Sequence, residues 1–397
     1  MRILFLTDNF PPEVNAPASR TYEHCKEWVK KGAEVTVITC FPNFPTGKVY
    51  NGYKNKLYLK EEIDGIKIIR VFTYITANKG TIKRTLDYIS FMLAALIAGL
   101  FVKTDFIVAT SPQFFTAIAG RLLSLVKKKE WLLEIRDIWP ESIKVVTGMD
   151  GFIIRFFEFL EKRMYKTADK IVIVTPELKN NLIKKHPYTV GKIKVITNGV
   201  EISKFNPNYV DSELKKNLGL EQKFVILYIG THGMAHGLDF ILKAVQKVKD
   251  KEIHFLFVGD GAKKQELLEL NKKLNLGNVT MLPSVLKNEV INYISVSDVG
   301  LVNLVKSDLF KAAIPSKIFE IAAMQKPILL GVEGEVQKII EKYNAGVAFE
   351  PENEGDFLEK LAQIKTDYQN YKQGANELAK TYDRKKLALD MLEFIEE

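Results

Sequence analysis

The stretch "IPSKIFEIAAM", residues 314–324, holds the side chains best suited to chemistry on a phosphate. Pro315 suits the first turn of a helix, so Ser316 and Lys317 would lie beside backbone N–H groups that lack a partner within the helix. A lysine there is a compact cation suited to phosphate oxygens. Glu320 would lie one turn beyond Ser316, on the same face, and could accept hydrogen bonds from ribose hydroxyls. A solvated helix start is the alternative.

A second candidate segment is glycine-rich. "GTHGMAHGLD" follows a hydrophobic run, and its glycines do not fit the dinucleotide pattern G-x-G-x-x-G, so NAD is not predicted. Gly230 and Gly233 would still let the backbone, including Thr231, approach a diphosphate, with His232 or His236 donating to it. Purely structural histidines are the alternative. In "VGDGAKKQEL", further along, Asp260 is predicted to cap the next helix.

The segment "RDIWPES" places a guanidinium and two carboxylates directly after the hydrophobic run "WLLEI". If that run is a buried strand, Arg136, Asp137 and Glu141 lie at the carboxyl edge of its sheet, where open parallel sheets bind ligands. The Trp139–Pro140 pair would stiffen the turn, because proline fixes its own φ and restricts the residue before it. An Arg–Asp pair that caps the next helix is the alternative.

A loop near the amino end completes the candidate segments. "TDNFPPEVNAPASR" joins the first predicted strand to the first predicted helix, where backbone N–H groups and the helix dipole favour an anion. Asn15 is therefore a candidate ligand contact, and a plain connecting loop explains the segment equally well.

The elements that must position these segments alternate along the chain. Continuous apolar strands separated by amphipathic helical stretches predict parallel sheets covered on both faces, and the pattern occurs twice. We predict an α/β protein with two doubly wound, Rossmann-like domains, whose ligand would lie between them. The expected boundaries are 1–205, 206–380 and a final helical segment, 381–397, that packs back on the first domain. The predicted strands are "RILFLT", "AEVTVIT", "IKIIRVF", "DFIVAT", "WLLEIR", "KIVIVT", "KIKVIT", "KFVILYIG", "IHFLFVG", "NVTMLP", "DVGLVNL", "KPILLG" and "GVAFE".

The charge distribution bears on partners. The chain of 397 residues has a formal net charge of +9, but residues 1–205 hold 32 Lys and Arg against 20 Asp and Glu, a net of +12. The first domain is thus expected to meet something anionic. No arginine-rich arm, RNA-binding signature or zinc-finger spacing indicates nucleic acid, so an anionic membrane surface is the better candidate.

The segments in their order resemble those of a known family. "FPPEVNAPASR", "RDIWPES", "VITNGVEISKF", "GTHGMAHGLD", "FVGDG" and "PSKIFEIAAMQKPIL" resemble the retaining glycosyltransferases of family 4, which have the GT-B fold. Within that family the chain is most similar to bacterial O-antigen and capsule enzymes, including L-fucosamine transferases. The family usually carries two glutamates eight positions apart, and here Glu320 matches the second while Ala312 occupies the first. Asn15 and Ala16 likewise replace a pair of glycines.

The resemblance implies transfer of a sugar, such as an N-acetylated amino sugar, from a nucleotide diphosphate sugar. UDP is the expected nucleotide, and the acceptor would be a polyprenyl-diphosphate-linked saccharide. Lys317, Ser316 and the glycine-loop backbone would hold the diphosphate, and backbone near Gly261 would lie against the base. Asp137 would orient or deprotonate the acceptor hydroxyl, assisted by Arg136, with Glu141 a weaker candidate for the same role. Neither a metal nor another cofactor is expected.

Location follows from two apolar segments and the cysteines. The start "MRILFLTDNF" lacks a signal peptide's long apolar core, and Cys25 and Cys40 offer no framework of bridges, so the cytoplasm is predicted. The apolar run 91–102 is too short to span a bilayer, and a buried core helix is its plainest explanation. With "FIIRFFEFLEKRMYK" it also suits peripheral attachment to the inner face of the plasma membrane.

Two other classes stay open. A GT-B-fold UDP-sugar epimerase would act without an acceptor, although its signatures are not evident in the sequence. A non-catalytic sugar-nucleotide-binding subunit would explain Ala312 in place of the first glutamate.

Overall fold

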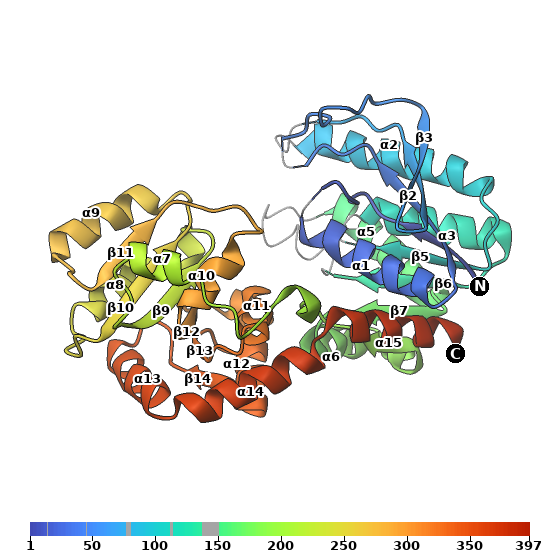
Figure 1. The fold of residues 1–397 in the computed structure, drawn as a ribbon. Helices are drawn as coiled ribbons and strands as arrows, with labels where there is room; N and C mark the ends of the chain where they lie inside the picture. The colour runs from blue at the N-terminus through green and yellow to red at the C-terminus, as the bar shows by residue number, and fades with distance from the viewer. Residues whose placement is uncertain (14, 45, 77–80, 112–113, 137–150) are drawn as a thin grey trace. The chain divides into compact units, whose positions relative to one another are not determined.

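The computed structural model describes the chain apart from residues 14, 45, 77–80, 112–113 and 137–150 (Figure 1). The chain forms two compact units. The first comprises Met1–Asn198 and Arg384–Glu397, and the second comprises Gly199–Asp383. The backbone therefore passes between the units at residues 198–199 and 383–384, where the sequence suggested 205 and 380.

The first unit is built on an eight-stranded sheet with the order β3-β4-β2-β1-β5-β6-β7-β8. All neighbouring strands are parallel except β3, which pairs antiparallel with β4. The strands are β1 Arg2–Leu6, β2 Glu34–Cys40, β3 Tyr58–Ile63, β4 Ile66–Val71, β5 Phe106–Thr110, β6 Trp131–Ile135, β7 Lys170–Ile173 and β8 Ile193–Val195.

Helices cover both faces of this sheet, as the continuous apolar strands predict. One core holds residues of α2, α3, α5 and α6 against one set of strand side chains, and a second core holds α1 and α15 against the alternate set. The helical segments are α1 Ala16–Lys30, α2 Thr81–Leu100, α3 Phe114–Lys127, α5 Phe152–Thr167, α6 Pro176–Lys185, the 3₁₀ helix η1 Pro187–Lys192, and α15 Arg384–Glu396.

The last helix, α15, belongs to the first unit although the whole second unit precedes it. It packs along α1, and the Trp28 indole N–H donates to the Ala388 carbonyl at 2.7 Å. Arg384 also donates two hydrogen bonds to Glu23, at 2.8 and 2.7 Å.

The second unit repeats the architecture with a six-stranded, fully parallel sheet of order β11-β10-β9-β12-β13-β14. Its strands are β9 Phe224–Ile229, β10 Ile253–Val258, β11 Val279–Leu282, β12 Val299–Asn303, β13 Ile328–Gly331 and β14 Gly346–Ala348. Its helical segments are η2 Ile202–Lys204, α7 Ser212–Asn217, η3 Met234–His236, α8 Leu238–Val245, α9 Lys264–Leu274, α10 Val290–Val296, η4 Asp308–Phe310, α11 Lys317–Ala323, α12 Glu335–Tyr343, α13 Glu354–Thr366 and α14 Tyr368–Thr381.

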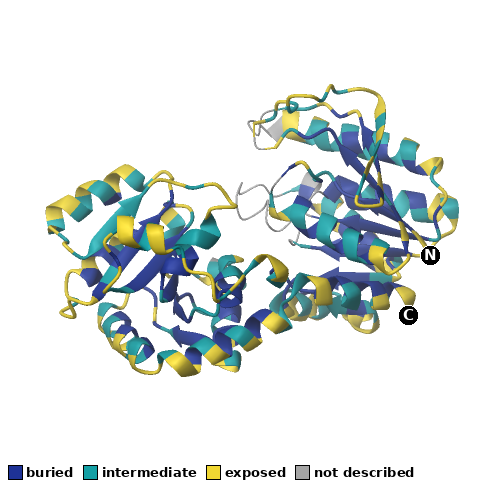
Figure 2. Cartoon of the chain, in the orientation of Figure 1, coloured by how far each residue is buried: buried dark blue, intermediate teal, exposed yellow. Residues whose placement is uncertain are grey.

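The predicted fold class is confirmed, and each of the thirteen predicted apolar runs forms a strand. Most strand residues are buried, as Figure 2 shows for both sheets. The sequence analysis missed β3, whose residues alternate between exposed and half-buried. An edge strand with one solvated face lacks the continuous apolar run that identifies the others.

Two helices of the first unit expose apolar side chains. On α2, Phe91 and Ala95 are buried, but Leu93 and Ile97 are 49% and 60% exposed, so the apolar run is not a fully buried core helix. On α5, Phe156 is 50% exposed. Among the described residues, no helix has both the length and the apolar character needed to cross a bilayer.

Candidate functional site

The loops that follow β9 and β10 interlock at the carboxyl edge of the second sheet. The Gly230 N–H donates to the Val258 carbonyl at 2.9 Å, and the His232 N–H donates to the Asp260 carbonyl at 2.8 Å. A Cβ atom at Gly259 would lie 1.8 Å from the Gly230 carbonyl oxygen, so only glycine permits this approach. The two loops therefore form one rigid rim, with several glycine positions, at the edge where α/β sheets bind ligands.

Lys317 reaches this rim from the start of α11. Its Nζ lies 4.1 Å from the centre of the Tyr228 ring, and a Cβ at Gly230 would lie 2.9 Å from the same Nζ. Burial lowers the pKa of Lys317 to about 8, against the attraction of Glu320. Lys317 forms an ion pair with none of the described carboxylates. A desolvated cation that lies over an aromatic face and has no ion-pair partner among the described residues is well placed to receive an anion.

Unsatisfied polar atoms surround the same place. Both ring nitrogens of His232, Nδ1 of His236 and Oδ1 of Asn303 are buried and have no hydrogen-bond partner in the described part of the chain. Asn303 ends β12 and donates its Nδ2 to the His236 carbonyl at 2.8 Å. Buried polar groups are nearly always paired in native proteins, so a group of orphaned atoms indicates a missing partner.

The two histidines differ in access. His232 is completely buried, and burial lowers its pKa to about 4, so the ring is neutral at physiological pH. His236 is half-buried, and burial followed by the charge of Lys317 lowers its pKa. Of the two residues, His236 is the more accessible; contact of His232 with a ligand stays a prediction. The neighbouring Thr231 is exposed, and its carbonyl accepts from the Tyr228 hydroxyl at 2.7 Å.

The start of α11 differs from the expectation. The helix begins at Lys317, so Pro315 precedes it instead of occupying its first turn, and Ser316 is the N-cap residue without a capping side-chain hydrogen bond. The exposed Ser316 hydroxyl therefore stays available to a ligand. Glu320 lies in the first turn, and Ala312 lies in the segment that leads into the helix.

The β10 loop gives a correction. Asp260 does not cap α9, which begins at Lys264 with Lys263 as its N-cap residue. Its Oδ1 instead accepts from the Gly261 N–H at 2.7 Å, because Gly261, at φ +153°, folds back against the His232 carbonyl. Gly233 precedes η3 with ordinary extended dihedrals.

In the first unit, the predicted residues that the structure describes have structural partners. Asn15 is the N-cap of α1; its Oδ1 accepts from the Ala18 N–H at 2.9 Å, and its Nδ2 donates to Asn9 Oδ1 at 2.6 Å. Arg136 directly follows β6, as predicted for the carboxyl edge of the sheet. Asp137 and Glu141 lie outside the described residues.

A buried ion pair lies beside Arg136. Arg20 on α1 donates to Glu134 at 2.9 Å, and the two side chains are 6% and 1% exposed. Burial alone would raise the pKa of Glu134, but Arg20 and Arg136 outweigh it and lower that pKa to about 2. Arg20 also donates to the carbonyls of Ile196 and Thr197, which precede the crossing into the second unit.

The sequence analysis missed two carboxylates of the first unit. Asp8 lies two residues after the end of β1, close to the position that identified Arg136, and burial raises its pKa. Asp87 lies within α2, where nothing in the sequence distinguishes it; burial and then the charge of Asp8 raise its pKa to about 7. In the second unit, the sequence analysis also missed Tyr228, which lies within β9, and Asn303, which ends β12.

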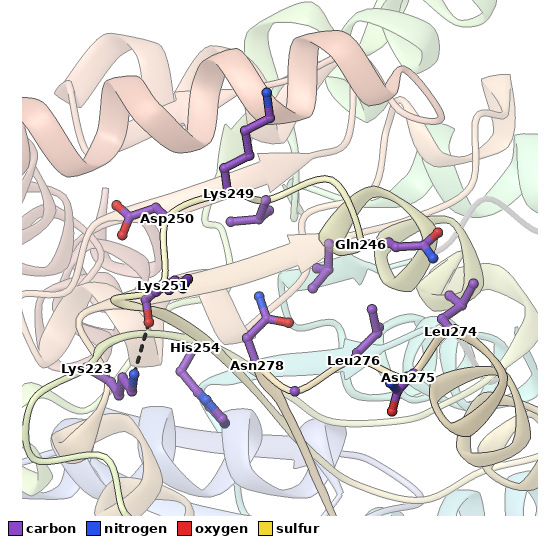
Figure 3. Close-up of a pocket in the computed structure, with 13 residues that line it drawn as sticks. Lys223, Gln246, Lys249, Asp250, Lys251, His254, Leu274, Asn275, Leu276 and Asn278 are labelled. Atoms are coloured by element: carbon purple, nitrogen blue, oxygen red, sulfur yellow. Dashed lines mark hydrogen bonds between the residues drawn. The ribbon is translucent and has the colours of Figure 1, made fainter.

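A cavity of about 370 Å³ lies at the opposite edge of the second sheet (Figure 3). Lys223, Lys251 and Asn278 line it and come shortly before β9, β10 and β11, whereas the interlocked loops follow β9 and β10. The Lys223 Nζ donates a hydrogen bond to the Lys251 carbonyl at 2.9 Å. This cavity is therefore separate from the Lys317 rim. Across the part of the chain that the structure describes, no three His, Cys, Asp or Glu side chains gather as metal ligands.

Comparison with known families identifies the two units. Residues 18–204 match the model of Glycosyltransferase Family 4, and residues 210–381 match that of Glycosyl transferases group 1. The chain belongs to glycosyltransferase family 4. The glycine loops and Lys317 all fall within the group 1 match.

Two relatives of this glycosyltransferase extend over most of it. The colanic acid biosynthesis glycosyl transferase WcaI of Escherichia coli is 26% identical over 367 residues, 89% of each chain. A Campylobacter jejuni enzyme is 20% identical and covers 78% of this chain and 80% of its own. That enzyme is named as an N-acetylgalactosamine-N,N'-diacetylbacillosaminyl-diphospho-undecaprenol 4-alpha-N-acetylgalactosaminyltransferase.

Solved structures share the fold. Sucrose-phosphate synthase of Thermosynechococcus elongatus superposes with a TM-score of 0.74 at 15% identity, covering 99% of this chain and 97% of its own. Anabaena HepE, in complex with UDP-glucose, gives a TM-score of 0.68 at 14% identity and covers 100% and 99%. The glycosyltransferase thus has the GT-B fold of two parallel-sheet α/β domains.

Proposed function

We propose that this enzyme transfers a sugar from a UDP-sugar to a polyprenyl-diphosphate-linked saccharide in bacterial surface polysaccharide synthesis, with retention of anomeric configuration. The observation that carries the donor half is Lys317, a desolvated cation without a described carboxylate partner, beside a glycine-built rim and a group of orphaned polar atoms. The names of WcaI and of the Campylobacter enzyme support polysaccharide synthesis and a lipid-linked acceptor. The UDP-glucose complex of HepE supports the choice of UDP.

The chemistry follows from charge on the leaving group. As the bond from the sugar to the diphosphate breaks, negative charge builds on the diphosphate, and fixed donors aimed there lower the barrier. Lys317, the Ser316 hydroxyl and the backbone after β9 supply those donors, and the proposed reaction needs no metal because Lys317 carries the positive charge. Glu320 accepts from the ribose hydroxyls, and His236 is the more accessible of the two histidines for the diphosphate.

The acceptor half rests on the carboxyl edge of the first sheet. Arg136 orients the acceptor or contacts its phosphate, and Asp137 orients or deprotonates the attacking hydroxyl, with Glu141 the weaker candidate. The enzyme acts at the inner face of the plasma membrane, where exposed Phe156 on α5 and the basic surplus of the first 205 residues favour an anionic surface.

A thermal-shift panel of UDP, GDP, TDP, ADP and NAD on wild type and Glu320→Ala tests the donor site. A ligand at about one hundred times its dissociation constant adds roughly 2.7 kcal/mol to the free energy of unfolding. We expect UDP alone to stabilise the wild type, and Glu320→Ala to weaken that shift. Absence of any response to nucleoside diphosphates would remove the donor assignment.

One alternative has an observation in its favour. Ala312, in place of a glutamate near the donor sugar, suits a non-catalytic subunit that binds a sugar nucleotide. Turnover by the purified protein with acceptor present would eliminate that alternative. Product formation from UDP-sugar without any acceptor would instead indicate an epimerase.

A further inference from the structure

A long apolar trough crosses the first unit between α2 and the edge of the sheet. Its cavity measures about 1250 Å³, above the roughly 300–1,000 Å³ of ordinary small-molecule pockets. Large exposed hydrophobic side chains line it: Leu57, Tyr58, Phe72, Leu93, Ile97 and Phe101. Monomeric proteins seldom expose so many apolar groups together without a use for them.

The trough exists because the sheet extends further than the helix that covers it. α2 packs on β2 and β4, while β3 continues the sheet beyond β4 as its outermost strand. Pairing of Tyr58 with Val71 and of Lys60 with Ile69 places these side chains on the face that α2 covers only in part. Leu93 and Ile97 on α2 and Phe101 just after its end recur every four residues, so they form the open side of the helix.

The direction of the trough relates it to the reaction. β4 ends at Val71 at the carboxyl edge of the sheet, and α2 then returns toward the start of β5. The end of the trough near Phe72 therefore lies at the carboxyl edge, where the acceptor is expected, and the end near Phe101 lies at the opposite edge. An occupant would extend from the acceptor edge along the length of the strands.

Exposed cations are more numerous near one end of the trough than near the other, where Lys103 follows Phe101. Exposed Lys54 and Lys56 come just before β3, and exposed Lys83 and Arg84 lie in the first turn of α2, all at the carboxyl edge. Along the trough itself charges are balanced, because its lining holds Lys60 and Lys67 against Glu61 and Glu62. One end is thus suited to an anion and the remainder to hydrocarbon.

We infer that this trough holds the hydrocarbon tail of an isoprenoid diphosphate, with its diphosphate at the Lys54, Lys56, Lys83 and Arg84 end. This inference rests on the proposed function, because it assigns a place to the lipid part of that acceptor. The apolar lining and the larger group of cations near the acceptor edge together match an amphiphile with one anionic head.

The test measures binding of farnesyl diphosphate, below its micellar concentration, by isothermal titration calorimetry. Leu93→Gln combined with Ile97→Gln replaces two exposed side chains and leaves the buried face of α2 intact. We expect the affinity for farnesyl diphosphate to fall about tenfold or more, with melting temperature and UDP binding unchanged. Leu286→Gln, at a 68% exposed position of the second unit, is the matched control and should bind as wild type does.

A second variant, Lys54→Gln with Lys56→Gln, addresses the anionic end. It should weaken farnesyl diphosphate binding and reduce the dependence of that binding on salt concentration. Equal affinity in wild type and the Leu93/Ile97 variant, or no binding to wild type, would overturn the inference. Loss of a wild-type dimer in the Leu93/Ile97 variant would also overturn it, since a second copy would then be the occupant. UDP binding is measured separately, so failure of the trough leaves the donor assignment standing.

Discussion

Desolvated cations in the two units have opposite surroundings. In the first unit, Arg20 bonds Glu134 and two carbonyls, and Arg70 bonds Glu61 and the Cys40 carbonyl. In the second unit, Lys317 lies over the face of Tyr228 and is attracted by Glu320, but it forms no ion pair with a described carboxylate. A desolvated cation with a full set of partners serves the fold, whereas one without an ion-pair partner is available to a ligand. Three predictions test that distinction, and a fourth concerns a buried carboxyl group.

Arg20→Met should have the largest effect. Removing the guanidinium leaves Glu134 buried without its ion-pair partner, with Arg136 the remaining nearby cation, which should lower the free energy of unfolding by about 3–5 kcal/mol in urea denaturation. Arg2→Met is the control, because Arg2 pairs with Asp105 at side-chain exposures of 44% and 37%, and exposed pairs contribute at most about 1 kcal/mol. Equal losses in the two variants would contradict the role assigned to Arg20.

Lys317→Met should weaken ligand binding without lowering the free energy of unfolding. Charge-assisted hydrogen bonds contribute about 1.5–3 kcal/mol, so affinity for UDP in calorimetry should fall by about tenfold to a hundredfold. The free energy of unfolding should stay level or rise at pH 7, because a desolvated charge is removed. Lys243→Met, an exposed change on α8, should alter neither quantity. A destabilised Lys317→Met protein that still bound UDP normally would show that Lys317 serves the fold and would contradict its assignment to a ligand.

The pH dependence of UDP binding should report the same lysine. With a pKa of about 8 in the free protein, Lys317 is charged below that pH and loses its proton above it. Affinity for UDP should therefore fall as pH rises through 8, by up to about tenfold per unit, and binding near pH 8 should take up protons. The folded pKa lies below the unfolded one, so the cost to stability is present below pH 8 and is relieved as pH rises toward the unfolded pKa. Lys317→Met should flatten the binding profile; an unaltered profile would assign the titration elsewhere.

Asp87→Asn should give the smallest effect. It concerns a carboxyl group of the first unit whose ionised form is disfavoured by burial and by the charge of Asp8. Because its folded pKa is raised to about 7, the native state binds the extra proton and loses stability as pH rises from about 4 to 7. At pH 8 the variant should therefore be more stable, by about 1–2 kcal/mol. Glu221→Gln, at an exposed loop position, should show no such gain. A variant without a stability gain that loses transfer activity would assign Asp87 to the acceptor site.

Local sequence pattern was enough to predict the place of many candidate site residues in the second unit. The glycines after β9, Ser316, Lys317 and Glu320 follow predicted strands or begin a predicted helix, so sequence order alone placed them near one sheet edge. Asp260 and Pro315 were misplaced because a helix start depends on where the preceding loop folds, and the contact of Gly261 with His232 joins two different loops. Asn303 and Asp8 were missed, although each ends or follows a strand.

The sequence by itself determined two α/β halves, because continuous apolar runs and helical periodicity are properties of short segments. It also placed Lys317, whose charge and helix-start position need only a few neighbouring residues. Tertiary structure alone decided that His232 is enclosed, that Asn15 is used as a cap, and that β3 extends the sheet beyond α2 to leave an open trough. These outcomes depend on contacts between residues far apart in the chain. Burial and hydrogen-bond partners are therefore determined only when those residues pack together in the folded protein.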